Sequence, residues 1–227
     1  LLPIVIIQAV ILMFLGTGAV ASKLAFERER KLLDYQRMTP MAPLGKIVGY
    51  LFGLPVREYF LFALTLPFLA FALIVGEFSP ERIIPFYVVF FSSVVLYHLT
   101  GMVGGMASAK PWRSQLMSQG LIVLLYIFLP QMSRLGLTLF EFLTFLPTFN
   151  GLILEELREI QPGLEHAAAQ AMPMVEPYRE VPFFGLKVHP TVFTMLVQGF
   201  LIITMFVVIY RKWLDEAAHI FSKLYGL

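Results

Sequence analysis

Hydrophobic residues gather along this chain into long runs that short charged segments separate. Five runs are apolar enough and long enough to cross a membrane as helices, and they cover residues 1–22, 58–76, 83–109, 114–131 and 190–210. About twenty apolar residues cross a hydrocarbon core of roughly 30 Å as a helix. Because the runs lack the alternation of barrel strands, the pattern predicts an all-α polytopic membrane protein with about five transmembrane helices in a single membrane domain, 1–227.

The composition excludes several classes of protein. Hydrophobic residues make up 58% of the chain and charged residues only 14%, whereas about a quarter of the residues of a soluble domain are charged. Cysteine is absent, which excludes a disulfide framework, a thiolate metal site and a cysteine nucleophile. A net charge of +2 is too small to indicate a nucleic-acid partner.

The placement of basic residues predicts which side of the membrane each loop faces. Eleven of the 17 Lys and Arg residues lie in loop 23–46, in the turn at 110–113 or in the tail after 210. Five lie in the segments 77–82 and 134–189, which face the opposite side of the membrane. An excess of Lys and Arg marks the cytoplasmic side. We therefore expect loop 23–46 and the C-terminus to be cytoplasmic, and the first residue of the sequence to lie outside.

Loop 23–46 carries a dense group of charges of both signs. Residues 27–34 read as a short helix, which the prolines at 40 and 43 end because proline restricts the residue before it. We expect its charged side chains to contact a soluble partner: Glu27, Arg28, Glu29, Arg30, Lys31 and Asp34. The alternative is a solvated loop whose basic residues set the topology and touch anionic lipid.

Glycines four residues apart occur in two places. Such glycines lie on one helix face and permit close approach of another helix in a membrane. The candidate helix-packing residues are Gly45, Gly49 and Gly53 in the first group and Gly101 and Gly105 in the second. Each group either packs within the chain or contacts a second copy or a partner helix.

The segment 134–189 is predicted to be external. Its first part is apolar but is interrupted by Glu141, Pro147, Asn150 and Gly151, so a re-entrant or interfacial helical segment fits better than a sixth crossing. Its second part is rich in proline and acidic residues, which favours an ordered external loop or cap.

No pattern in the sequence indicates catalysis, so we predict no catalytic residues and no cofactor. A Ser, His and Asp arrangement, a phosphate-binding glycine loop and an HExxH pattern are all absent. The spacing of His166, Glu165 and His189 matches no standard metal site. His98 is the only histidine within a predicted span, and haem ligation between helices usually needs a second ligand, so we predict a packing role for it.

The order of these features resembles the membrane subunits of type 2 ATP-binding-cassette (ABC) exporters. The residues that carry the resemblance are Glu27-Arg28-Glu29, Leu32-Leu33, Thr39-Pro40 and Gly45-Lys46. The resemblance implies six spans, of which the first is missing from this sequence, and a coupling helix in the loop after the second span that docks on a nucleotide-binding ATPase subunit. The nucleotide-binding motif itself is absent here, as is usual when the ATPase is a separate polypeptide.

The leading functional hypothesis is therefore a permease subunit of an ABC exporter in a bacterial inner membrane. Its expected partners are the ATPase, a second permease copy or a related permease, and membrane lipids. The alternative is a non-transporting scaffold or accessory subunit of a larger respiratory or photosynthetic complex. An intramembrane enzyme is disfavoured because the spans carry no convergent set of polar residues.

Overall fold

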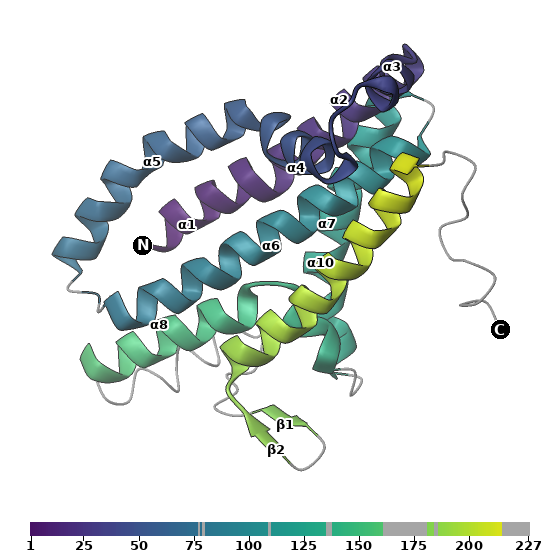
Figure 1. The fold of residues 1–227 in the computed structure, drawn as a ribbon. Coiled ribbons are helices and arrows are strands. Elements are labelled where there is room, and N and C mark those ends of the chain that lie inside the picture. The colour runs from purple at the N-terminus through teal and green to yellow at the C-terminus, as the bar shows by residue number, and fades with distance from the viewer. Residues whose placement is uncertain are drawn as a thin grey trace. The chain divides into compact units, whose positions relative to one another are not determined.

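The fold consists almost entirely of helices (Figure 1). In this computed structural model the described residues are 1–76, 78, 80–108, 110–134, 138–160, 181–183 and 186–214. Four stretches have the length and hydropathy of membrane-crossing helices: Leu2–Glu29, Val56–Val75, Pro80–Ala107 and Pro190–Leu214. The predicted all-α polytopic membrane fold is confirmed, and the chain is an integral membrane protein.

The helices follow one another with short connections. The first crossing comprises α1 (Leu2–Ala9), a π-helical segment η1 (Val10–Gly16) and α2 (Thr17–Glu29), and it is followed by α3 (Leu32–Met38), α4 (Pro43–Gly53) and α5 (Val56–Val75). Then come α6 (Pro80–Ala107) and α7 (Pro111–Arg134). Helix α7 contains the predicted span 114–131, but it is not among the four stretches with the length and hydropathy of membrane-crossing helices.

The predicted external segment contains a 3-10 helix, a longer helix and a small hairpin. These are η2 (Thr138–Leu143), α8 (Leu146–Ile160), β1 (Val181–Phe183) and β2 (Leu186–Val188), and α10 (Pro190–Leu214) follows them. The two strands pair antiparallel, with Val181 opposite Val188. Residues 161–180, for which the sequence predicts an external loop or cap, lie outside the described residues.

The described residues divide into two compact units. Unit 1 comprises Leu1–Ala70, Val94–Ile122 and α10 from Leu201 onward, and unit 2 comprises Phe71–Ser93 and Val123–Phe200. The candidate site lies in unit 1. The core of unit 1 joins α2, α3, α4, α6 and α10 through buried side chains: Val20, Leu24, Leu33, Ile47, Leu51, Leu99, Met102, Ile209 and Trp213.

The π-helical segment η1 faces a buried histidine of α6. The His98 Nε2 lies 2.9 Å from the carbonyl oxygen of Leu12, and its Nδ1 lies 3.3 Å from the Tyr59 hydroxyl. Because a carbonyl only accepts hydrogen bonds, Nε2 donates to Leu12 and Nδ1 accepts from Tyr59. A Cβ on Gly16 would lie only 2.7 Å from the His98 Nε2, so glycine leaves the room that the ring occupies. His98 has the packing role predicted for it.

Unit 2 contains a cluster of aromatic rings. Phe86 of α6 lies with its ring centroid 6.0 Å from that of Phe145 and 5.5 Å from that of Phe149, in the segment predicted to be re-entrant or interfacial. Phe142 of η2 packs edge-on against Phe193 of α10 at 4.9 Å. Edge-to-face aromatic pairs add stabilisation beyond the area that they bury. These contacts fix η2 and the start of α8 within unit 2.

Candidate partner-docking site

The charged segment is two helices rather than one. Residues 27–34 were predicted as a single short helix, but α2 continues as far as Glu29 and α3 begins at Leu32. Between them Lys31 adopts a left-handed conformation with φ 58°, which cannot continue a right-handed helix. The prediction of one helix is therefore wrong, because the left-handed conformation of Lys31 separates α2 from α3.

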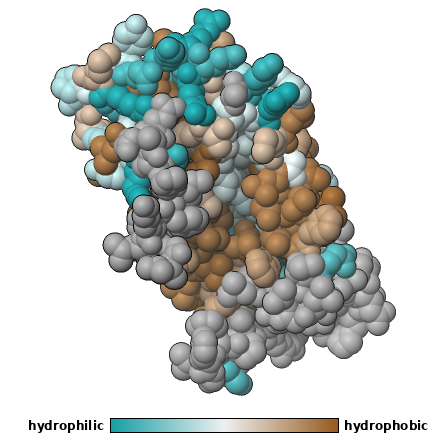
Figure 2. Space-filling view, turned by 90° about the vertical axis from the view of Figure 1, so that its right-hand side faces the viewer, coloured by the Kyte–Doolittle hydropathy of each residue, from teal (hydrophilic) through white to brown (hydrophobic). Residues whose placement is uncertain are grey.

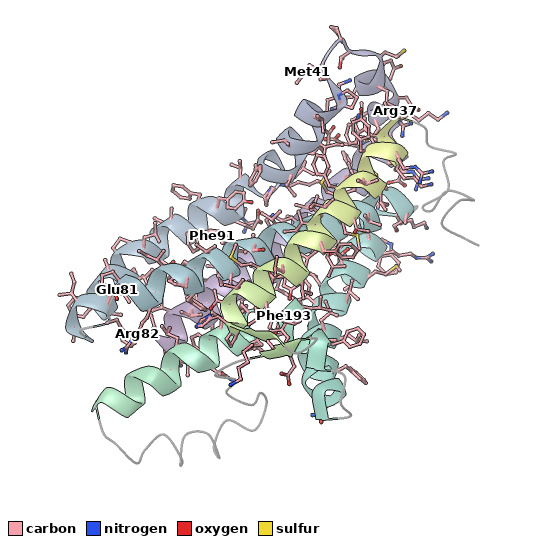
Figure 3. The ribbon with its side chains drawn as sticks, turned by 60° about the horizontal axis from the view of Figure 1, so that its bottom comes forward. Arg37, Met41, Glu81, Arg82, Phe91 and Phe193 are labelled. Carbon is pink, nitrogen blue, oxygen red and sulfur yellow. The ribbon has the colours of Figure 1, made fainter. Side chains whose placement is uncertain are left out.

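Arg37 attaches α3 to the last turn of α10 (Figure 3). Its Nε donates to the Trp213 carbonyl at 3.1 Å, and its Nη2 donates to the Lys212 carbonyl at 3.2 Å. Its Nη1 lies 3.1 Å from the Asp34 carboxylate, which orients the guanidinium. The last carbonyls of a helix have no partner within it and carry partial negative charge, so a cation is favourable there.

The start of α4 is attached to the end of α3. The Lys46 side chain is 7% exposed, and its Nζ donates to the carbonyls of Gln36 and Thr39. Thr39 precedes a proline and has extended backbone, which ends α3 there. A buried ammonium is tolerated only where hydrogen-bond acceptors replace water. Lys46 therefore holds the turn between the two helices in one conformation.

Tyr50 of α4 connects three elements. Its hydroxyl donates to the Glu27 carboxylate at the end of α2, and its ring centroid lies 5.2 Å from that of Trp213 in α10. Burial raises the pKa of the Tyr50 phenol above its ordinary value of 10.0, and the hydrogen bond to Glu27 raises the pKa further. The charge of that carboxylate acts in the same direction, while the Gln36 side chain opposes it. Tyr50 therefore remains a neutral donor at physiological pH.

The predicted contact residues fall into two groups. Glu27 accepts from Tyr50, Arg28 donates to the carbonyl of Met106 at the end of α6, and Asp34 pairs with Arg37, so these three bind within unit 1. The other three side chains are exposed, as is Asp34 despite its ion pair: Glu29, Arg30 and Lys31. The guanidinium of Arg30 lies 4.2 Å from the ring centroid of Phe26, an exposed cation–π contact.

Sequence reasoning missed three exposed apolar side chains at this end of unit 1. Tyr35 is 67% exposed, Met38 is 74% exposed, and Met41 in the following turn is 60% exposed. Figure 2 shows hydrophilic side chains gathered at the upper end of the molecule, to which α3 belongs in Figure 1. Their three-residue spacing could have indicated these exposed positions. The many charged residues around them drew the prediction to the charges instead.

The two glycine groups have different surroundings. A Cβ on Gly101 would lie 2.8 Å from the carbonyl oxygen of Thr17, and one on Gly105 would lie 2.8 Å from that of Ala21, so α6 packs closely on α2. A Cβ on Gly45, Gly49 or Gly53 would meet nothing within 4 Å. The first group of glycines therefore has no packing partner among the described residues.

The open glycines line a groove on α4 with a volume of about 450 Å³. Its wall also includes Glu27, Lys46 and Tyr50, which are already hydrogen-bonded to other parts of unit 1. The groove can admit a side chain or the backbone of a close neighbour, but its polar groups are engaged. Among the described residues, no group of three or more His, Cys, Asp or Glu side chains could hold a metal ion.

Comparison of this chain with protein-family models, with curated proteins and with solved structures found no match.

Proposed function

We propose that this chain is the membrane-spanning permease subunit of an ABC-type exporter, which couples ATP hydrolysis by a separate subunit to movement of a substrate across the membrane. The observation that carries the proposal is the attachment of α3 to α10 by Arg37. A force on the exposed helix α3 acts directly on the end of a membrane-crossing helix. Coupling between two sites requires such a connection between the element that one ligand contacts and the element that moves.

The other attachments of this region support the same proposal. Lys46 of α4 binds the end of α3, while Glu27 and Arg28 bind the end of α2 to α4 and to the end of α6. A partner that displaces α3 therefore moves several helix ends together, rather than only bending a flexible loop. This is the behaviour expected of a coupling helix.

The distribution of basic residues supports a cytoplasmic location for this end of unit 1. Arg28 lies near the end of α6, and Arg37 lies at the end of α10, so residues that the sequence predicts to be cytoplasmic meet at one end of the unit. A soluble ATPase in the cytoplasm of a bacterium would reach α3 there. A second permease copy would complete the transporter.

The coupling role of Arg37 can be tested with an Arg37→Ala variant of the chain carrying one cysteine at Val207, which is exposed on α10. In the complex with its ATPase, we expect ATP to change the maleimide labelling rate of that cysteine about fivefold relative to ADP, within the usual range of coupling between sites. Arg37→Ala should retain the ATPase but lose this nucleotide effect, because α3 no longer holds α10.

The matched control is Glu29→Ala, since Glu29 is charged and exposed in the same segment. It should preserve the nucleotide effect. If the Arg37→Ala complex responds to ATP as the wild type does, α10 is not moved through Arg37. If no ATPase copurifies with the wild-type chain, the exporter proposal is wrong.

A scaffold subunit of a larger respiratory or photosynthetic complex is the second candidate. The open glycine groove on α4 favours it, because a neighbouring helix can approach there closely. The two candidates differ in what copurifies after gentle solubilisation. An ATPase supports the exporter, whereas cytochromes or pigment proteins without an ATPase support the scaffold.

A further inference from the structure

The first crossing changes its helical geometry near its middle. Between α1 and α2, the seven residues of η1 form a π-helix, in which hydrogen bonds join residues five apart rather than four. Such segments are rare inside α-helices and are frequent at functional sites. A π-helical turn holds about one residue more than an α-helical turn. Which side chains of α1 face the rest of unit 1, here called the register of α1, therefore depends on the geometry of η1.

Two polar side chains from other helices bind carbonyls of η1. The His98 Nε2 of α6 donates to the Leu12 carbonyl at 2.9 Å, and the Gln119 Nε2 of α7 donates to the Phe14 carbonyl at 3.4 Å. Both side chains are buried, where a polar group is costly unless it is paired. Helices α6 and α7 therefore hold η1 in its π-helical form.

Two glycines of the first crossing leave room for the same two side chains. A Cβ on Gly16 would lie 2.7 Å from the His98 Nε2, and a Cβ on Gly18 would clash with the Gln119 amide. A larger residue at either position would displace the side chain that binds η1. The sequence of the first crossing therefore fits the two donors that hold its π-helical segment.

The π-helical form leaves one buried hydroxyl without a partner. Thr17, the first residue of α2, is fully buried, and its Oγ1 has no hydrogen-bond partner among the described residues. In an α-helix, a threonine hydroxyl can donate to the carbonyl four residues earlier, which is that of Met13 here. An α-helical η1 would therefore offer this hydroxyl an acceptor, which partly compensates for losing the two donors from α6 and α7.

Helix α1 can bury apolar side chains in either register. At present Gln8 is buried, and its Nε2 donates to the Thr65 hydroxyl of α5 at 2.8 Å. If η1 becomes α-helical and loses its extra residue, α1 turns by about 100° and advances by about 1.5 Å relative to α2. Each inward position is then taken by the next residue, so Ala9 replaces Gln8 and Ile6 replaces Val5. Both newcomers are apolar, while the loss of the Gln8 hydrogen bond keeps the present register favoured.

We propose that η1 is a register switch: His98 and Gln119 hold it π-helical, and when they release it the segment becomes α-helical and α1 turns relative to α2. All of these residues belong to unit 1, in which α1 lies beside α5 and α6 (Figure 1). The switch links the packing of α6 and α7 on the first crossing to the contact between α1 and α5. A ligand or partner that favours one arrangement of these helices shifts the equilibrium between the two registers. Neither the switch nor its test involves an ATPase, so its failure would leave the exporter proposal unchanged.

The test measures distances within unit 1 by pulsed electron paramagnetic resonance, with the chain in lipid nanodiscs. Because the chain has no cysteine, spin labels attach only at introduced ones: Ile7→Cys on α1, paired with Phe68→Cys on α5 or Met117→Cys on α7, all at exposed positions. The double variant His98→Leu/Gln119→Leu removes both donors and keeps most of their bulk. It should shift at least one of the two distances by several ångströms, because a point about 5 Å from a helix axis moves about 8 Å in a turn of about 100°.

Deletion of Leu15, an exposed residue of η1, distinguishes a change of register from a loss of packing. The deletion removes the extra residue, so η1 should be α-helical with α1 in its present register, and both distances should match the wild type. The double variant made in this background should keep them as well, because no extra residue remains. The matched control is Gln198→Leu, which removes the hydrogen bond of another buried glutamine to Ser93 in unit 2 and should leave both distances unchanged.

Two outcomes would overturn the proposal. If the double variant keeps both distances of the wild type, the two donors do not control the register of α1. If the double variant shifts the distances equally with and without Leu15, the shift reflects a loss of packing rather than a change of register. Gln119→Leu alone is the milder variant if the double variant does not fold. It should give a mixture of the two distances, and a single wild-type distance would overturn the proposal in the same way.

Discussion

Glycine has two opposite roles in this chain despite the same four-residue spacing. Gly101 lies against the backbone of α2, where a Cβ would be 2.8 Å from the Thr17 carbonyl oxygen, whereas Gly49 faces the open groove of α4. In a helix interior, glycine costs up to about 1 kcal/mol relative to alanine, and only a close contact compensates for this cost. The two positions therefore allow a matched comparison of the same substitution.

Gly101→Ala should destabilise the solubilised protein by about 1–3 kcal/mol, because α2 and α6 must separate to admit the new methyl group. Gly49→Ala should stabilise it by about 0.5–1 kcal/mol through helix propensity alone. Thermal unfolding of the two purified variants measures both effects. An equal loss of stability in both would show that the α4 groove is closed by a contact in the purified protein.

The stability of the folded protein should depend on pH through the side chain of Tyr50. Because its folded pKa is raised, its contribution to stability is fully present below pH 10 and is lost as the pH rises from there toward the folded pKa. Tyr50→Phe removes a hydrogen bond to Glu27 and should cost about 1 kcal/mol near pH 8. Unfolding measured between pH 8 and pH 11 should show the difference from the wild type shrinking above pH 10. A difference that stays constant over this range would contradict the assignment.

At the scale of elements, hydrophobic pattern alone predicts the membrane-crossing helices, because a helix in lipid must be apolar along its whole length. The break at Lys31 could not be predicted, since lysine has no preference for positive φ and the surrounding residues all form helices well. That the Arg37 side chain points toward α10 could not be predicted either. Its carbonyl partners lie 175 and 176 residues away in the sequence, so only the folded chain brings them together.

In the candidate site, the sequence likewise could not show which charged side chains of residues 27–34 bind within unit 1. The sequence marks residues 27–34 as a charged partner contact, but Glu27, Arg28 and Asp34 bind within unit 1. Which charges remain exposed depends on where the ends of α4, α6 and α10 supply carbonyls and hydroxyls. The exposure of Tyr35 follows from the same packing, because Arg37 on the other side of α3 binds toward α10.

At the scale of the whole molecule, the distribution of basic residues predicts the orientation in the membrane. Positions 31 and 110 belong to the segments with excess positive charge, whereas Lys187 belongs to the opposite segments. The chain contains no cysteine, so a single introduced cysteine is the only site for a maleimide. In sealed cells, a membrane-impermeant maleimide added outside should label Lys187→Cys and leave Lys31→Cys and Lys110→Cys unlabelled until the membrane is permeabilised. External labelling of Lys31→Cys would place α3 where no cytoplasmic ATPase can reach it, which would exclude the exporter proposal.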